Sequence, residues 1–293
     1  NAQGDTRSYR NILIISFFLN IILNPLFVFG FGIIPPFGIS GLAIATIISQ
    51  LISLIYIFIK VVKIDLISIV NLKFFFIKQN FILDLIKQGM PTTISLILIG
   101  LGIYNILFFV SKFGDIATGG YGVALRIEQL LLLPTIGLNT AVLSITGQNF
   151  GAKEYSRIKE VYFKAIFYGA CLMLIAGIFV FISGNFLIQL FTSDQEVIEY
   201  GVKYLKIAAF IGPVYPIFFI TNAFFQGIKK PIYSTYINFF RIVALPFGIM
   251  WLILNYFNGS FEDLFLGLLI INWVFGIFIV ILVKYYFLKR LTN

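Results

Sequence analysis

The sequence contains no histidine and a single cysteine. Zinc-hydrolase motifs that pair two histidines, and catalytic triads that use histidine as the base, are therefore excluded within this chain. Cys171 lies in a long apolar stretch, where a thiol serves as a small packing group rather than a reactive one. The alternative of a membrane-embedded enzyme has little support, because no cysteine pair and no clustered set of carboxylates is present.

Charged residues are also scarce. They make up 11% of the 293 residues, hydrophobic residues make up 60%, and the mean hydropathy is +1.00. These values are not those of a soluble domain. The net charge of +9 does not come from lysines and arginines clustered on one face, so nothing indicates a nucleic-acid partner. The composition predicts a protein embedded in a lipid bilayer.

Several apolar stretches have the length of about 20 residues that a helix needs to cross the hydrocarbon core. They lie at residues 10–30, 40–60, 90–111, 121–146, 163–190, 200–226, 232–256 and 263–287. The predicted fold class is therefore an all-α integral membrane protein with eight transmembrane helices.

Most lysines and arginines fall in every second gap between these stretches. They are Arg7 and Arg10, then Lys60, Lys63, Lys73, Lys78 and Lys87, then Lys153, Arg157, Lys159 and Lys164, then Lys229 and Lys230, then Lys284, Lys289 and Arg290. The alternate gaps contain only Lys112, Lys203 and Lys206. Because basic loops stay on the cytoplasmic side during insertion, we predict that both termini and the basic loops are cytoplasmic.

Two segments of the chain resemble each other. Each has, in this order, a Gln-Gly pair, a basic residue, a Phe-Phe pair and a proline. In the first copy these features start at Gln3, Arg7, Phe17 and Pro25, and in the second copy they start at Gln226, Lys229, Phe239 and Pro246. The shared orientation suits a parallel repeat about an axis along the membrane normal. By this spacing of roughly 220 residues we expect four further spans, or about 140 residues, before residue 1.

Four motifs together carry a resemblance to a known family. They are Asn20-Ile-Ile-Leu-Asn24-Pro25, Gly38-Ile-Ser-Gly41-Leu-Ala43-Ile-Ala45-Thr46, Gly89-Met-Pro91 and Gly147-Gln148-Asn149-Phe-Gly151-Ala152. In order and spacing they resemble the multidrug and toxic compound extrusion (MATE) family, in its DinF-like branch. The resemblance implies a twelve-helix, two-lobe transporter of which this chain holds helices five to twelve.

The predicted domains follow from this resemblance. Residues 1–62 hold the last two helices of the N-lobe, residues 63–88 form a cytoplasmic linker with amphipathic segments, and residues 89–293 form a complete six-helix C-lobe. The resemblance also implies a monomeric carrier in the plasma membrane of a bacterium. It would export small amphipathic or cationic compounds by rocking of the two lobes, with a proton or sodium as coupling ion and no other cofactor.

An alternative function within the same superfamily is a flippase for lipid-linked oligosaccharides. A flippase of this kind needs a strongly cationic cavity for pyrophosphate, and only Arg126 and Arg241 lie inside apolar stretches where they could supply the charge. The sequence therefore favours the antiporter.

The resemblance places a cation or proton site at Asn20, Asn24 and Thr46. Asn20 and Asn24 are four residues apart and so share one helix face. Family members often have aspartate where this chain has Asn24, and an asparagine cannot titrate. The alternative is that these amides only form hydrogen bonds between helices.

Glu128 is the only acidic residue deep within a predicted span. An unpaired charge at this depth is costly, so we predict that Glu128 approaches Arg126 or Arg241, directly or through water. Two residues apart, Arg126 and Glu128 cannot face each other on a helix. The pair could be structural, or Glu128 could line a cavity and attract cationic substrates.

Further polar and bending positions complete the predicted C-lobe site. The additional cavity candidates are Tyr104, Asn105, Asn139 and Asn222. Bends are expected at Pro25, at Pro134 with Gly137, and at Pro213 with Pro216, because proline removes a helical hydrogen bond.

Overall fold

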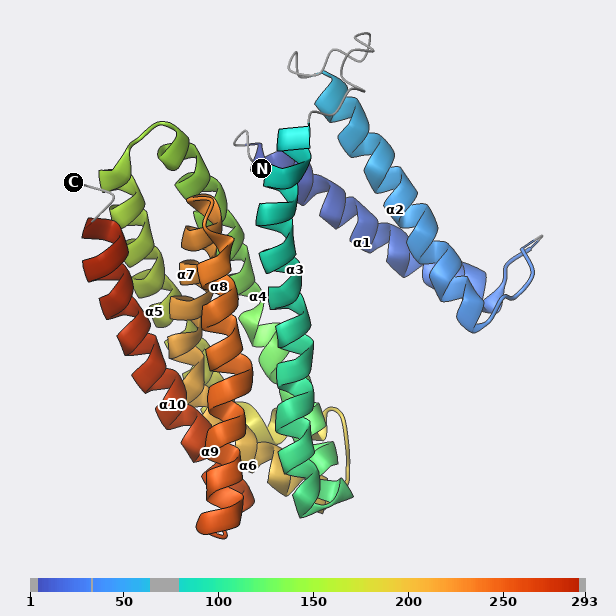
Figure 1. Ribbon diagram of the computed structural model, residues 1–293. Helices are drawn as coiled ribbons and strands as arrows, with labels where there is room; N and C mark the ends of the chain where they lie inside the picture. The colour runs from blue at the N-terminus through green and yellow to red at the C-terminus, as the bar shows by residue number, and fades with distance from the viewer. Residues whose placement is uncertain (1–4, 33, 64–78, 290–293) are drawn as a thin grey trace. The chain divides into compact units, whose positions relative to one another are not determined.

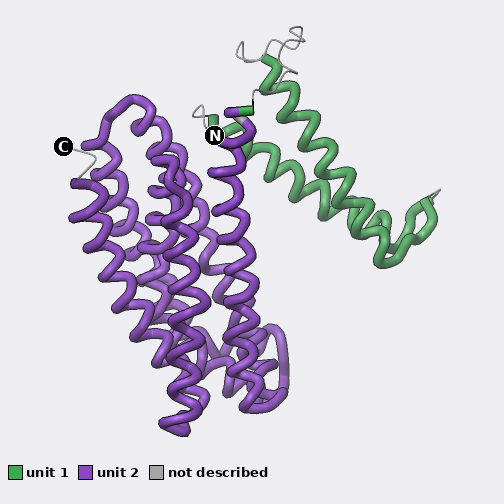
Figure 2. The backbone as a smooth tube through the Cα atoms, viewed as in Figure 1, with its two compact units in different colours: residues 1–79 green, residues 80–293 purple. Residues whose placement is uncertain are grey.

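The computed structural model describes residues 5–32, 34–63 and 79–289. Its described residues form helices joined by short turns, and eight of the helical spans are long and apolar enough to cross a membrane. This confirms the predicted all-helical membrane fold. The chain divides into two compact units, residues 1–79 and 80–293 (Figure 2). The boundary lies inside the predicted linker, and residues 64–78 of that linker, like Gln3 of the predicted repeat, lie outside the described residues.

Unit 1 is a pair of antiparallel helices, α1 (Thr6–Phe29) and α2 (Ile39–Val62). The Asp5 side chain begins α1 by accepting a hydrogen bond from the Ser8 backbone at 3.0 Å. A side chain at Gly41 would clash with the backbone of Phe27, so glycine allows α2 to approach α1 closely.

Unit 2 is a bundle of long helices. Its elements are α3 (Gln79–Val110), α4 (Asp115–Gly151), α5 (Tyr155–Gln189), α6 (Gln195–Ile211), α7 (Tyr215–Gly227), α8 (Pro231–Asn238), α9 (Leu245–Tyr256) and α10 (Phe261–Leu282). Successive spans alternate in direction (Figure 1). As a result, the basic turns 152–154 and 228–230 lie at one end of unit 2, and the turns 111–114, 190–194 and 257–260 lie at the other.

Helix α3 includes both the last residues of the predicted linker (63–88) and the predicted start of the C-lobe at residue 89. Helix α3 starts at Gln79 and runs without a break through Gly89 and Pro91. Residues 80–88 contain no glycine or proline, so nothing in that segment stops the helix of the following span from extending backwards.

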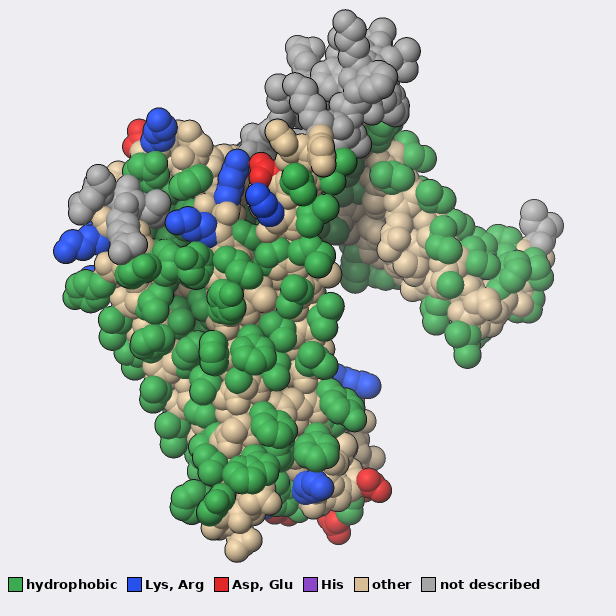
Figure 3. Space-filling view, viewed as in Figure 1, with side chains coloured by type: hydrophobic (Ala, Val, Ile, Leu, Met, Phe, Trp, Pro, Cys, Tyr) green, Lys and Arg blue, Asp and Glu red, His purple; other side chains and the backbone are tan. Residues whose placement is uncertain are grey.

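Aromatic rings dominate the core of unit 2. Tyr121 and Tyr204 meet edge-to-face with ring centroids 4.9 Å apart, and Tyr204 meets Phe265 at 4.6 Å. Helices α4 and α6 approach closely at Gly120, where an added Cβ would lie 2.7 Å from the Val197 carbonyl oxygen. The outer surface of unit 2 is largely hydrophobic, and most charged side chains on the visible face lie toward its two ends (Figure 3), as a protein in lipid requires.

Within the long spans of the described residues, regular α-helix gives way to tighter or wider turns. A 3₁₀ turn, η3 (Gly212–Val214), separates α6 from α7 between Ile211 and Tyr215, and π-helical segments occur at η4 (Phe239–Ala244) and η5 (Val283–Leu288). The predicted interruption at Pro213 and Pro216 is thus present, and the Phe210 carbonyl beside it accepts a hydrogen bond from the Trp273 indole at 2.9 Å. Pro25 and Pro134, in contrast, lie within uninterrupted α1 and α4.

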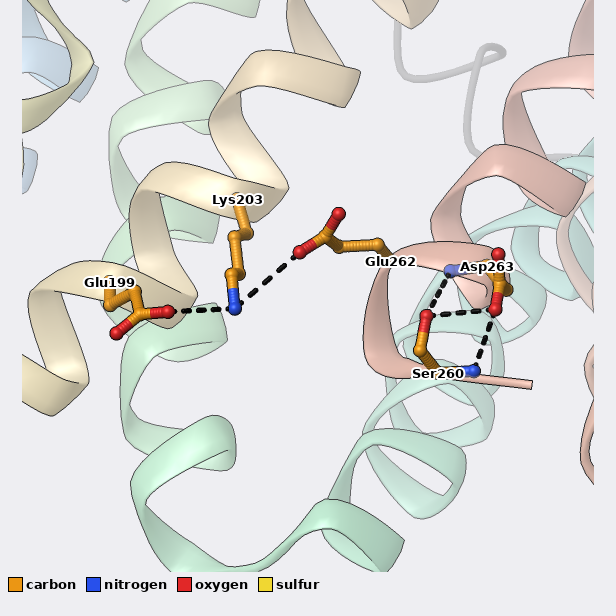
Figure 4. A network of polar contacts seen from close by, with 5 residues as sticks. All are labelled: Glu199, Lys203, Ser260, Glu262 and Asp263. Carbon is orange, nitrogen blue, oxygen red and sulfur yellow. Dashed lines mark hydrogen bonds and ion pairs between the residues drawn. The ribbon is translucent and has the colours of Figure 1, made fainter. Parts of the chain in front are cut away.

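A polar network fixes one end of the bundle (Figure 4). The Lys203 ammonium lies 2.8 Å from a Glu199 carboxylate oxygen and 3.5 Å from Glu262, which joins α6 to α10. Ser260 and Asp263 form a reciprocal capping box at the start of α10. Lys203 is one of the few basic residues in the alternate gaps of the sequence, and two carboxylates here offset its charge.

Candidate functional site

Unit 2 contains a partly open cavity of about 270 Å³. The walls come from α3, α4, α6, α7, α10 and the segment around η4. The polar residues that line it are Tyr121, Glu128, Gln129, Tyr204, Tyr215, Asn222, Asn238, Arg241 and Asn272. The other lining residues are mostly aliphatic or aromatic, so the cavity combines apolar walls with a few convergent polar groups, as ligand sites do.

Glu128 provides the negative charge of this cavity. Its residue is only 7% exposed, because α4 places it on the face that packs into the bundle. The Tyr204 hydroxyl donates a hydrogen bond to Oε2, and the Tyr215 hydroxyl donates to Oε1 at 2.8 Å. A buried carboxylate is tolerated only when such donors replace water. Each oxygen has one tyrosine donor, so each retains a lone pair for a further partner.

Arg241 provides the positive charge. Its guanidinium carbon lies 4.8 Å from the ring centroid of Tyr215 and 4.2 Å from that of Phe218, distances typical of cation–π contacts. Its Nε donates to Asn272 Oδ1 at 3.3 Å. The Asn272 amide nitrogen in turn donates to the Leu268 carbonyl at 2.8 Å, which fixes the direction of the amide oxygen.

The sequence predicts that Glu128 approaches Arg126 or Arg241, directly or through water. An approach through water stays a prediction, and the described part of the chain contains no direct ion pair of Glu128. The ion pairs found there join Lys164 to Glu160, and Lys203 to Glu199 and Glu262. Arg126 is exposed on the opposite side of α4 from Glu128, and it does not line the cavity. Arg241 does line it, but Tyr215 contacts both charged residues. The Tyr215 hydroxyl donates a hydrogen bond to the Glu128 carboxylate, and the Tyr215 ring makes a cation–π contact with the Arg241 guanidinium.

The remaining C-lobe candidates occupy different places. Asn222 lines the cavity and donates to Asn238 Oδ1 at 3.0 Å. Asn105 donates to the Val243 carbonyl in the π-helical segment at 3.2 Å, outside the lining. Tyr104 is 70% exposed on the bundle surface. Asn139 is not among the lining residues either, although its buried Oδ1 has no partner.

The unit 1 candidates bond mainly to their own helices. Asn20 donates to the Ser16 carbonyl at 2.9 Å, and Thr46, which is exposed, donates to the Leu42 carbonyl at 2.8 Å. Asn24 has a buried Oδ1 without a partner. No hydrogen bond among the described residues of unit 1 joins the three side chains, so their convergence on one ion stays a prediction.

Sequence reasoning missed six polar residues of the cavity: Tyr121, Gln129, Tyr204, Tyr215, Asn238 and Asn272. Tyr204 and Tyr215 gave no signal, because tyrosines are common in this chain and periodicity does not show which hydroxyl meets a carboxylate. Asn272 did carry a signal: it is a lone amide in the interior of the last apolar span, where an amide needs a partner.

Comparison with known proteins gives a consistent result. The family model described as MatE matches residues 91–252. The chain is 27% identical to the "Probable multidrug resistance protein YpnP" of Bacillus subtilis, over 84% of this chain and 54% of that protein. It is 29% identical to the multidrug export protein MepA of Staphylococcus aureus, over 64% of this chain and 41% of that protein. The chain thus spans about half the length of the curated relatives it matches.

Solved structures show the same fold. A MOP superfamily transporter from Pyrococcus furiosus superposes with a TM-score of 0.90 at 23% sequence identity, over 99% of this chain and 64% of that one. At this identity the likeness establishes the fold, and the chemistry of the site depends on the residues of this chain.

Proposed function

Because this chain belongs to the MatE family, we propose that the protein is an antiporter that exports small amphipathic or cationic compounds in exchange for protons or sodium. The observation that carries the proposal is the buried carboxylate of Glu128 in a cavity with aromatic walls. A carboxylate with spare lone pairs attracts a cation, and ring faces attract both flat apolar groups and positive charge. The Bacillus and Staphylococcus relatives support a bacterial cell membrane as the location. We propose that the carrier works there as a monomer.

The alternative flippase function is not favoured by the cavity. Of the two arginines that could have made the cavity cationic, only Arg241 lines it, and Glu128 lines it too. A site for a pyrophosphate would need an excess of positive charge.

We place the coupling ion in unit 1, near Asn24. The support is its buried and unpartnered Oδ1, an oxygen of the kind that coordinates a cation or bonds a hydronium. Antiport requires that the ion and the exported compound stabilise different conformations of the carrier. Asn24→Leu should therefore uncouple transport from the gradient, whereas Asn255→Leu should not, because Asn255 is an exposed amide that bonds only its own helix.

Transport by proteoliposomes tests the proposed function. The protein encoded by the complete gene is reconstituted, and movement of the cationic dye rhodamine 123 is followed under an imposed proton gradient and, separately, a sodium gradient. We expect gradient-dependent movement above that of empty liposomes. Glu128→Gln should slow it by about tenfold or more, because a charge-assisted contact is lost.

The matched control is Glu160→Gln, which removes a carboxylate from an exposed helical ion pair with Lys164 and should leave transport unchanged. Equal transport by the Glu128 and Glu160 variants would contradict the assignment of the cavity.

A further inference from the structure

A groove with charged walls opens on the outer surface of unit 2, between α5 and α6. Its volume is about 640 Å³, and it lies toward the end of the unit that carries the turn 190–194. Helix α5 contributes Phe181 and Asn185 to its lining, and α6 contributes a stripe that begins at Gln195 and ends at Lys206. This charged groove is separate from the cavity that contains Glu128, because the two share no lining residue.

Lys206 brings an uncompensated positive charge to the charged groove. Among the described residues its ammonium has neither an ion pair nor a hydrogen bond, and the residue is exposed. Lys203, three residues away, is shared by Glu199 and Glu262 (Figure 4). Lys206 lies inside an apolar span, Gln195–Gly227. A lysine in this position extends its ammonium toward the phosphates of the membrane surface.

The charges of this region follow an order along α6. Glu199 lies nearest the end of the bundle, and Lys206 lies deepest, seven residues or roughly 10 Å from Glu199 along the helix axis. The two carboxylates of Glu199 and Glu262 share the single ammonium of Lys203. A net negative charge therefore lies nearer the aqueous end than the unpaired positive charge of Lys206. A complementary ligand has its cation outermost and its anion deeper in the membrane.

A second groove, which is apolar, adjoins the charged groove on the side toward the middle of the spans. Its volume is about 530 Å³, and its lining includes Cys171 of α5, Pro213 of η3 and Trp273 of α10. Phe181 of the charged groove and Phe210 of the apolar groove meet edge-to-face with ring centroids 5.6 Å apart. The two grooves therefore follow one another along the same pair of helices.

The spacing of the two grooves fits a single lipid. Pro213 follows Lys206 by seven residues, which is roughly 10 Å along a helix axis. One acyl chain extends through half of the hydrocarbon core, or about 15 Å. A lipid whose phosphate lies at Lys206 therefore reaches the apolar groove with its chain.

We propose that these two grooves bind phosphatidylethanolamine from the leaflet at this end of unit 2. The phosphate pairs with Lys206, the ammonium lies toward Glu199 and Glu262, and one acyl chain lies in the apolar groove. Phosphatidylglycerol has the phosphate but no cation for the two carboxylates. Phosphatidylcholine has a cation without N–H donors, so it cannot form charge-assisted hydrogen bonds with them. The site goes beyond the proposed antiport, because its ligand is a membrane lipid and not the exported compound.

Photo-crosslinking tests the inference. The protein encoded by the complete gene is reconstituted in phosphatidylcholine liposomes that contain a small fraction of a lipid with a diazirine in one acyl chain. The headgroup of this lipid is ethanolamine, choline or glycerol on an identical chain, and the crosslinked residues are located by mass spectrometry. We expect labelling of the apolar groove, at residues such as Cys171 and Trp273, to be about fivefold stronger with ethanolamine than with the other two headgroups.

Two pairs of variants test the headgroup contacts. Lys206→Gln should lower the ethanolamine labelling by about fivefold, the effect of one lysine contact with a lipid phosphate, and Lys206→Arg should retain it. Glu199→Gln should lower it by about threefold and leave choline labelling unchanged. The controls Lys112→Gln and Glu196→Gln should change nothing, because both residues lie toward the same end of unit 2 and line neither groove. All four substituted side chains are exposed, so each variant should unfold at the wild-type temperature.

Three results would overturn the inference. Equal labelling of the apolar groove by all three headgroups would reduce the site to ordinary contact with lipid. Unchanged labelling of the Lys206→Gln protein would remove the phosphate contact. Stronger labelling by the glycerol headgroup than by ethanolamine would contradict the role of the two carboxylates. Each of these results would leave the proposed antiport untouched, because dye transport is measured separately.

Discussion

The guanidinium of Arg241 lies over the ring of Tyr215, 4.8 Å from its centroid, and the hydroxyl at the other end of that ring donates to Glu128 at 2.8 Å. One side chain thus contacts both charged groups of the cavity. A direct ion pair would neutralise them and close the site. Because Tyr215 separates them, both charges remain available to a ligand.

Removing the Tyr215 hydroxyl should destabilise the site without displacing Arg241. Tyr215→Phe keeps the ring and removes one donor from a buried carboxylate, so we expect a loss of about 1–3 kcal/mol in the free energy of unfolding. Tyr215→Leu should lose more, because the cation–π contact disappears as well. Thermal unfolding in detergent, calibrated against denaturant titration, measures both.

The control for this pair is Tyr236→Phe. Tyr236 is 56% exposed, and its hydroxyl has no bond to a described residue, so its removal should have little effect. A Tyr215→Phe protein as stable as the Tyr236→Phe protein would show that the hydroxyl is not needed to hold Glu128.

Close packing of α4 on α6 should depend on Gly120. An added Cβ there would lie 2.7 Å from the Val197 carbonyl oxygen and 2.8 Å from the Tyr200 Cβ. Gly120→Ala should therefore lower stability by about 1–3 kcal/mol, the usual cost of overpacking. Gly122→Ala, two residues along the same helix, has nothing within 4 Å of its new Cβ and should be neutral or slightly stabilising. A thermal unfolding measurement in which Gly122→Ala is less stable than Gly120→Ala would contradict this account.

Helix α3 should be held to α8 by a hydroxyl chain. Ser95 donates to Thr235 Oγ1 at 3.1 Å, and Thr235 donates to the Pro91 carbonyl at 2.8 Å. Thr235→Val keeps the shape and removes both bonds, so we expect a loss of about 1 kcal/mol, within the range measured for bonds between membrane helices. Thr140→Val removes an exposed bond to its own helix and serves as the control in the same unfolding assay. Equal stability of the two variants would argue against the interhelical role.

Orientation in the membrane can be measured by labelling single cysteines in a background with Cys171 replaced. Ser156 lies at the start of α5, near a basic turn, and Ser193 lies in the turn before α6; both are exposed. We expect a membrane-impermeant thiol reagent to label Ser193→Cys in intact cells and to label Ser156→Cys only after the cells are opened. Ser260 is avoided because it caps α10. The reverse labelling pattern would invert the topology.

The number of spans and the class of the protein followed from the sequence, because a bilayer selects helices by length and hydropathy, which are local properties. The burial of Glu128 could be predicted for the same reason, since a lone carboxylate in an apolar span avoids lipid. That α3 is already helical over residues 79–88 could not be predicted, because no residue between 80 and 88 marks where the membrane surface begins.

The partners within the cavity were decided by tertiary structure. Tyr204 and Tyr215 lie 76 and 87 residues from Glu128 in the chain, and Arg241 meets Asn272 from within a π-helical segment. Each residue of a helix turns the side-chain direction by about 100°. A 3₁₀ turn before Tyr215 and a π-helical turn at Arg241 therefore redirect these side chains relative to regular helices. Which side chains meet depends on these local changes in winding and on the close packing of distant helices, and hydropathy contains neither.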